Sequence, residues 1–334
     1  MPSNLRNYPS MDSLFFFGGI GIVAIALTDF IYTTLSCNGS GYLSTGLNRL
    51  LGKLLVPHSD GMRNWTGVIH LVASLLMWII LLLAGGFLVY LSDDEMVVRA
   101  ATKVPATASE RAYYTAFVFS TLGIGDYAPG NSMGRHVTAV YSLLGFGVLT
   151  TAITYILSVT GAVTQKKNLA TFISGMGQTP SELLAYFTTD PDGTLFSGRI
   201  DDLVNQLNSH LNDHLSYPIV HYFHSNRGAW SAVIQLAALY ECLVALRIRY
   251  RANPEVLAHA DRLERSFAYF LEVAHIPDKL RMEDDGQHVQ LRQQWMKEVM
   301  ETPGYSPPTN ENSRALGAVL RQGGYGWADV YSKD

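Results

Sequence analysis

Hydrophobic residues are concentrated in three long runs within the first half of the chain. Leu14–Ser36 is a 23-residue run whose only charge is Asp29, and Gly67–Leu91 and Val137–Val163 contain no Asp, Glu, Lys or Arg. About 20 consecutive apolar residues are enough for a helix to cross the roughly 30 Å hydrocarbon core of a bilayer. The pattern therefore predicts three transmembrane helices.

The first run could instead be a cleaved signal peptide. Its leading segment carries only Arg6 as a positive charge, Asp29 interrupts the apolar stretch, and no A-x-A site follows it. A signal peptide has a basic leader and a small-residue cleavage site. The sequence therefore favours a retained helix.

Two ionisable residues, Asp29 and His70, lie inside predicted spans. An ionisable group at membrane depth is by default a functional candidate with a partner. Both lie near the inner ends of their helices, so a contact between them is geometrically feasible. Simple snorkelling toward the interface is the alternative.

A leucine stripe occupies the connection between the first two runs. Ser44, Asn48, Arg49 and Lys53 fall on the face opposite to it. This spacing predicts an amphipathic helix lying in the membrane interface, either as a plain anchor or as an element that transmits force to a gate. The stripe consists of Leu43, Leu47, Leu50, Leu51, Leu54 and Leu55.

The segment from Glu110 to His136, between the second and third runs, is apolar and aromatic but has a hydrophobic part about half as long as a span requires. Non-helical backbone at membrane depth is tolerated where it lines a pore. Gly123 and Gly125 alternate with bulkier residues, and alternating glycines allow successive carbonyl oxygens to point the same way. Four such strands would form stacked oxygen rings around a cation.

The residues Thr121-Leu122-Gly123-Ile124-Gly125-Asp126 resemble the Thr-Val-Gly-Tyr-Gly-Asp filter signature of the potassium channel family with two transmembrane helices per pore. The similarity covers Gly67–Val163, and Tyr113 and Tyr114 occupy the aromatic pair of the family's pore helix. The resemblance implies an all-α membrane protein that forms a tetrameric pore-loop channel, with an outer helix, pore helix, filter and inner helix. It also implies K⁺ bound at Thr121, Leu122, Gly123 and Ile124.

Two positions depart from the family pattern. Ile124 replaces the Tyr or Phe whose ring packs behind the filter, and Phe117 stands where some members carry a glutamate that bonds the filter aspartate. A poorly selective monovalent cation channel, passing Na⁺ as well as K⁺, is therefore the alternative within this class. By the resemblance Asp126 faces the outer mouth, whereas a turn aspartate is the plainer interpretation.

The third run contains Gly145 and Gly147 in mid-span, followed by Thr150 and Thr151. The glycines can form an inner-helix hinge or a packing site. The threonine hydroxyls can face the ion cavity or bond back to their own helix. Both pairs of interpretations stay open at this stage.

Orientation follows from the resemblance, which places the filter mouth outside the cell. Lys166 and Lys167 then lie on the cytoplasmic side, as do Arg49 and Lys53, in agreement with the positive-inside rule. We expect a multi-pass protein of the cell membrane with its N-terminus outside and its C-terminal domain cytoplasmic.

Charged residues dominate the second half: residues 165–334 hold 16 of the 24 Lys and Arg and 20 of the 28 Asp and Glu. A small acidic excess argues against nucleic-acid binding, so the expected partners are membrane lipid and other copies of the chain in a homotetramer. Helical periodicity, with a capped start at Thr179, predicts a mainly helical domain, followed from Ser306 by a loose tail. We expect three segments. Residues 1–66 contain a transmembrane helix and an interfacial amphipathic helix, residues 67–164 form the pore domain, and residues 165–334 form a helical cytoplasmic domain for assembly or gating.

Four histidines within fifteen residues form the remaining constellation: His210, His214, His221 and His224. Each pair shares a helix face, where imidazoles can bind a transition metal or sense protons near pH 6.5. A solvated or core histidine set is the plainer interpretation. The alternative classes are a membrane-anchored metal-dependent sensor or enzyme and a structural subunit that does not conduct alone. The main expectation is a channel and not an enzyme, with permeant K⁺ in place of a cofactor and an unidentified gating ligand.

Overall fold

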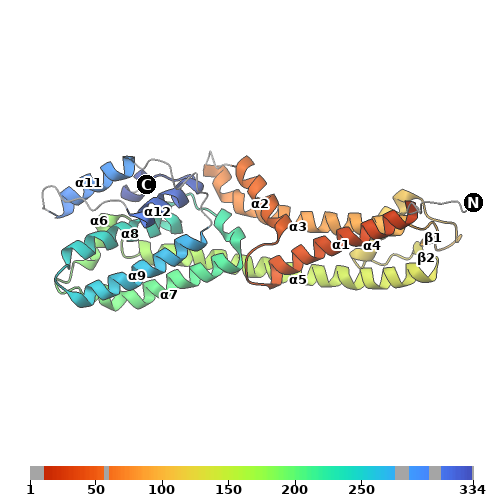
Figure 1. Ribbon diagram of the computed structural model, residues 1–334, viewed down its shortest axis with the longest axis horizontal. Helices are drawn as coiled ribbons and strands as arrows, with labels where there is room; N and C mark the ends of the chain where they lie inside the picture. Colours follow the sequence, from red (N-terminus) through yellow and green to blue (C-terminus); the bar gives the residue numbers. More distant parts are fainter. Residues whose placement is uncertain (1–10, 56–59, 275–285, 301–309, 333–334) are drawn as a thin grey trace, which may run out of the picture. The chain divides into compact units, whose positions relative to one another are not determined.

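The computed structural model describes residues 11–55, 60–274, 286–300 and 310–332 (Figure 1). Three of its helices are long and apolar enough to cross a membrane, namely α1 (Met11–Leu35), α3 (Asp60–Leu91) and α5 (Ser132–Ser174). They coincide with the three hydrophobic runs, which confirms the prediction of an all-α membrane protein. α5 continues as one helix beyond its apolar part into the charged half of the sequence.

The chain forms two compact units, each built from segments that are separate in sequence. Unit 1 comprises residues 1–48 and 71–158, and unit 2 comprises residues 49–70 and 159–334. Helices α2 (Tyr42–Leu54), α3 and α5 each contribute residues to both units.

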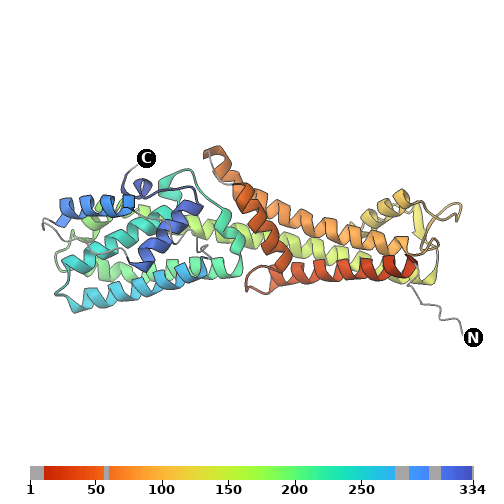
Figure 2. The same cartoon turned by 45° about the horizontal axis from the view of Figure 1, so that its top comes forward.

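In unit 1, α1, α3 and α5 run side by side, with α4 (Ala108–Phe119) and two short strands at one end (Figures 1 and 2). α1 approaches α3 closely at Gly19 and Gly85, where a Cβ on Gly19 would lie 2.5 Å from the Gly85 carbonyl oxygen. Small residues permit such close contact between membrane helices. Strands β1 (Val97–Arg99) and β2 (Tyr127–Pro129) pair antiparallel on either side of the re-entrant segment.

Asp29 has a structural role in unit 1. Its buried carboxylate accepts hydrogen bonds from the indole Nε1 of Trp78 (2.8 Å) and from the backbone N–H of Leu43 (2.8 Å), as well as from the hydroxyl of Ser44. Leu43 and Ser44 lie in the first turn of α2, whose free N–H groups favour a negative charge. Asp29 therefore joins the C-terminal part of α1 to α2 and α3. His70 belongs to unit 2, where its ring stacks on Tyr222 with centroids 3.7 Å apart.

The leucine-striped segment is helical, as predicted, and forms α2. Its polar residues Ser44 and Asn48 are buried against the protein, whereas Leu50 and Leu54 are 56% and 70% exposed. Arg49 and Lys53 are also exposed, and a helix that presents leucines beside basic side chains is suited to the interface between lipid and water. This arrangement supports contact with lipid.

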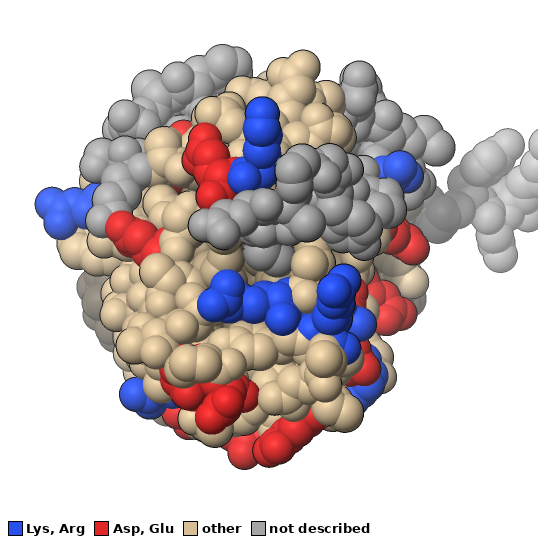
Figure 3. Space-filling model, turned by 90° about the vertical axis from the view of Figure 1, so that its left-hand side faces the viewer, with Lys and Arg blue, Asp and Glu red and all other residues tan. Residues whose placement is uncertain are grey.

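Unit 2 is a helical domain centred on α8 (Ala232–Arg249), in which every residue from Ala232 to Leu243 is buried. Around it pack α6 (Pro180–Phe187), α7 (Thr194–Ser216), α9 (Pro254–Val273), α11 (Gly286–Met300), α12 (Glu311–Gln322) and α13 (Ala328–Tyr331), with 3₁₀ turns η1 (Pro218–Tyr222) and η2 (Gly228–Trp230). Figure 3 shows acidic and basic side chains interspersed on one end of the molecule, as on an ordinary solvated surface.

The prediction of a capped helix start at Thr179 is confirmed, since its side chain accepts a hydrogen bond from Glu182 N at the start of α6. The prediction of a loose C-terminal tail is wrong for residues 310–332, because α12 buries Leu316 and Val319 in the core of unit 2. Asn310 caps this helix by accepting from Ser313 N. Residues 301–309 lie outside the described part of the chain.

Candidate ion-conducting site

The pore helix α4 is anchored at both ends. At its start the Glu110 carboxylate accepts the backbone N–H of Thr107 (2.8 Å) and pairs with Arg99 (2.7 Å). At its end the N–H groups of Thr121 and Leu122 donate to carbonyls of the last helical turn, at 3.0 and 2.9 Å. The filter residues therefore continue directly from a fixed helix of 12 residues, too short to cross the membrane, as expected for a re-entrant loop.

The backbone of the filter alternates in conformation. Thr121, Gly123 and Gly125 have φ of 57°, 58° and 87°, whereas Leu122 and Ile124 between them lie outside the positive-φ region. In an ordinary strand successive carbonyls point to opposite sides, so reversing the conformation of every second residue turns them toward one side. The backbone of Thr121 is strained in this geometry, because a β-branched residue is unfavourable at positive φ. Such backbone strain is concentrated at functional sites.

Aromatic side chains pack around helix α4, which precedes the candidate filter segment. Tyr114 is 2% exposed, and its hydroxyl and that of Tyr90 lie 2.8 and 3.1 Å from Thr138 Oγ1 on α5. Phe117 is buried beside Tyr114, with ring centroids 4.9 Å apart. Phe117 is thus part of an apolar cluster that fastens α4 to α3 and α5.

The Asp126 carboxylate contacts both helix α4 and the residue that follows it in the chain. Its carboxylate interacts with the Tyr113 hydroxyl of the pore helix and accepts the backbone N–H of Tyr127 at 3.1 Å. Its carbonyl oxygen accepts from Ala100 N (2.9 Å), which ties the segment to the chain beyond β1. Tyr113, one turn before Phe117, braces the filter aspartate in this chain.

The inner-helix glycines differ in their surroundings. A Cβ on Gly145 would lie 1.9 Å from the Phe119 carbonyl oxygen at the end of α4, whereas nothing in the described residues lies within 4 Å of one on Gly147. Gly145 is therefore a packing site at which α5 touches the pore helix. Thr150 bonds back to Phe146 O, within its own helix, and Thr151 follows it on the same helix.

The four histidines form a row in unit 2. His210 and His214 are buried on α7, and His214 Nε2 lies 3.4 Å from Nδ1 of His221 in η1; His224 follows, with its ring 6.2 Å from that of His221. Within the described residues no group of three or more His, Cys, Asp or Glu side chains is arranged to hold a metal ion. Burial, with the charges of Lys166 and His221, lowers the pKa of His210 to about 3, so it is a neutral core residue at physiological pH.

A buried ionic cluster in unit 2 was not predicted from the sequence. Glu241 bonds Arg292 Nε (2.6 Å) and His288 Nε2 (3.1 Å), and all three side chains are at most 1% exposed. Burial opposes ionisation of Glu241, but the bonds from His288 and Arg292 outweigh it and lower the pKa of Glu241 to about 2. The one feature of the sequence that could have indicated this cluster is Glu241, a lone acidic residue in the apolar run of α8.

Comparisons with known proteins support an ion-channel segment in this chain. Residues 76–161, which include the end of α3, α4, the filter and the membrane part of α5, match the ion channel family. The chain is 27% identical over 272 residues to the uncharacterized membrane protein YdjJ of Bacillus subtilis (strain 168), an alignment that covers 79% of each chain and extends well outside the channel segment. No solved structure matches the chain. The match to residues 76–161 therefore supports the resemblance of this segment to the potassium channel family with two transmembrane helices per pore.

Proposed function

We propose that four copies of this chain form a potassium channel in which K⁺ passes through the carbonyl oxygens of Thr121, Leu122, Gly123 and Ile124. The observation that carries the proposal is the alternating backbone from Thr121 to Gly125 on a re-entrant loop between two membrane helices. Carbonyl oxygens aimed at one axis replace the hydration shell of a monovalent cation.

Several copies are needed because one strand offers oxygens from one side of an ion only. In the single subunit the side chains of Leu122 and Ile124 are 62% and 57% exposed. Apolar side chains of this size find cover against neighbouring subunits in a closed ring. The Thr121 hydroxyls would add a ring of oxygens at the inner end, and four Asp126 carboxylates would concentrate cations at the outer mouth.

The proposed topology places the filter mouth and the N-terminus outside the cell membrane and most of unit 2 in the cytoplasm. Lys166 and Lys167, at the end of the apolar part of α5, support this orientation by the positive-inside rule. Unit 2 would then serve in assembly or gating, because α5 enters it as a continuous helix.

The test is the reversal potential of the purified full-length protein in planar bilayers under opposed K⁺ and Na⁺ gradients. The inactive variant is Gly123→Ala, since alanine at φ 58° costs about 1–2 kcal/mol in each subunit although no atom lies within 4 Å of the new methyl group. The matched control is Gly21→Ala, which adds the same methyl group in open space on helix α1.

Reversal near the potassium equilibrium potential in the wild type and in Gly21→Ala, with no current in Gly123→Ala, is the expected result. Robust current that reverses near zero would replace the proposal by a poorly selective cation pore, the outcome that the missing ring at Ile124 would produce. Silence of a correctly assembled wild-type tetramer would contradict the proposal and favour a structural subunit.

A further inference from the structure

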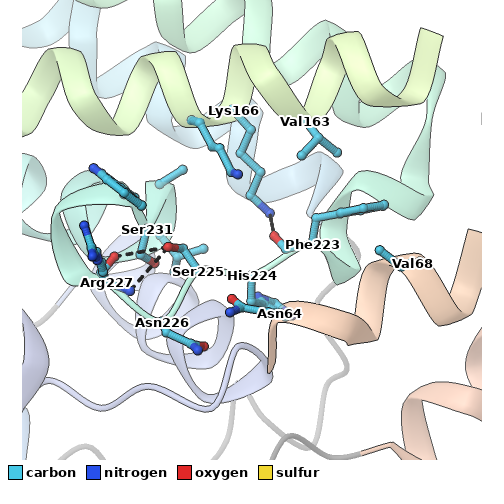
Figure 4. Close-up of a pocket in the computed structure, with 14 residues that line it drawn as sticks. Asn64, Val68, Val163, Lys166, Phe223, His224, Ser225, Asn226, Arg227 and Ser231 are labelled. Atoms are coloured by element: carbon cyan, nitrogen blue, oxygen red, sulfur yellow. Dashed lines mark hydrogen bonds between the residues drawn. The ribbon is translucent and has the colours of Figure 1, made fainter. Parts of the chain in front are cut away.

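Unit 2 contains a cavity of about 520 Å³ that the proposed ion path does not use. Asn64 and Val68 of α3 and Val163, Lys166 and Lys167 of α5 form one part of its wall, and residues 223–227 and 230–233 form the rest (Figure 4). The cavity is therefore built where two membrane helices enter unit 2, with a connecting segment of the helical domain against them.

The charges around this cavity all have one sign. Lys166, Lys167 and Arg227 line it, and none of the described lining residues is Asp or Glu. Three cations without an opposing carboxylate create a positive potential inside a partly enclosed space, which attracts an anion. Ordinary solvated surfaces intersperse both signs, as the end of the molecule in Figure 3 does.

Lys166 is the buried cation of the set, with 7% of its surface exposed. Its ammonium donates to the carbonyls of Val220 (3.0 Å) and Phe223 (2.8 Å), as Figure 4 shows for Phe223. An ammonium has three N–H donors, and neutral carbonyls orient it without cancelling its charge. A bound anion would offset the cost of burying that charge.

The wall opposite α5 is held in place before any ligand binds. Ser225 donates its N–H to the Tyr325 hydroxyl (3.2 Å), and its own hydroxyl accepts the N–H of Arg227 (3.3 Å). The Arg227 guanidinium lies 4.4 Å from the ring centroid of Trp230, a cation–π contact that fixes its position. A preorganised wall loses little entropy on binding.

Apolar side chains complete the cavity on the membrane side. Val68 and Val163 belong to helices α3 and α5, and Phe223 packs on α3 at Gly67, where a Cβ would lie 2.4 Å from the Phe223 ring. Lys166 lies three residues after the apolar run of α5 that ends at Val163, and the proposed topology puts this position at the level of the lipid headgroups. The ligand should therefore have an anionic head and an apolar body.

We propose that this cavity binds the headgroup of an anionic phospholipid. The phosphate lies among Lys166, Lys167 and Arg227, and the glycerol and acyl chains leave along Val68 and Val163. This site is independent of ion conduction, so its test does not depend on the proposed channel function.

The experiment is native mass spectrometry of the full-length protein in nonionic detergent, titrated with dioleoyl phosphatidylglycerol or dioleoyl phosphatidylcholine. Lys167→Gln/Arg227→Gln removes the two accessible cations and leaves Lys166 in the fold. Arg265→Gln/Lys297→Gln is the matched control, because it removes two exposed cations of the same unit outside the cavity.

Phosphatidylglycerol should bind the wild type more tightly than phosphatidylcholine, and the cavity variant should lose affinity on the order of tenfold. The control should change it by about twofold or less. Equal binding of the two lipids to the wild type, or equal losses in variant and control, would overturn the proposal. Cavity-dependent binding of inorganic phosphate or ATP without a preference for phosphatidylglycerol would also overturn it, by assigning the cavity to a soluble anion.

Discussion

Acidification should destabilise unit 2 through His210. Its side chain is 1% exposed and lies against His214 and Phe270, with ring centroids 5.1 and 5.3 Å away. Burial and the neighbouring positive charges lower the pKa of His210 to about 3 in the folded protein, from 6.5 in the unfolded chain. Between these values the unfolded chain binds a proton that the folded protein does not, so stability falls as the pH decreases below 6.5.

The size of the effect follows from the two pKa values. Each pKa unit corresponds to about 1.4 kcal/mol, so full protonation of this group in the unfolded state alone would cost about 5 kcal/mol. At pH 5.0, about 1.5 units below the unfolded pKa, the cost is about 2 kcal/mol, whereas at pH 7.5 it is close to zero. The equilibrium constant for opening of the domain should rise about 30-fold between these two pH values.

Cys242 serves as the probe for opening of unit 2 because its side chain is fully buried in the core. Burial also raises the pKa of its thiol in the folded protein. In a Cys37→Ser background it is the sole cysteine, and its reaction with 4,4′-dithiodipyridine reports opening of the domain. Rates at each pH are divided by those of the denatured chain to remove the intrinsic reactivity of the thiol. Where reclosing is faster than labelling, this ratio measures the opened fraction.

His210→Leu is the matched variant, since it keeps an apolar side chain in the core and removes the titrating group. The wild type should lose about 30-fold more protection than this variant between pH 7.5 and 5.0. If both proteins lose protection equally, His210 does not titrate across this range as its burial requires, and the reasoning is refuted.

Two further predictions concern packing and charge. Gly145→Ala should abolish channel current while the protein still inserts in membranes, because its methyl group would lie 1.9 Å from Phe119 O; Gly147→Ala should conduct normally, and currents from both in bilayers check this. Glu241→Gln should destabilise unit 2 by about 3–5 kcal/mol by leaving buried Arg292 without its counter-charge. Thermal unfolding measures this loss, and a double variant that replaces both residues by Met should recover most of it.

Local patterns of sequence were sufficient to predict the three helices of membrane-spanning length and the backbone conformation of the candidate filter segment. Three apolar runs predicted α1, α3 and α5 because a membrane helix satisfies its own backbone and needs only about 20 apolar residues. Gly123 and Gly125 indicated the left-handed backbone because few other residues adopt it. These features depend on neighbours within a few residues.

Tertiary structure decided the role of residues whose partners are distant in sequence. Asp29 contacts Trp78, 49 positions away, and so changes from a functional candidate to a connection between helices. Gly145 became a packing site only once α5 was placed against the end of α4.

In unit 2 the roles of the candidate residues depended even more on partners that are distant in sequence. Burial of His210 against Phe270 and the cation cavity around Lys166 depend on helices brought together by the fold. Periodicity shows which face of a helix is apolar, whereas it does not show which helix covers that face. The sequence by itself therefore determined the membrane helices and the filter backbone, and only the packing of the helices decided which charged and imidazole side chains became buried and what surrounds them.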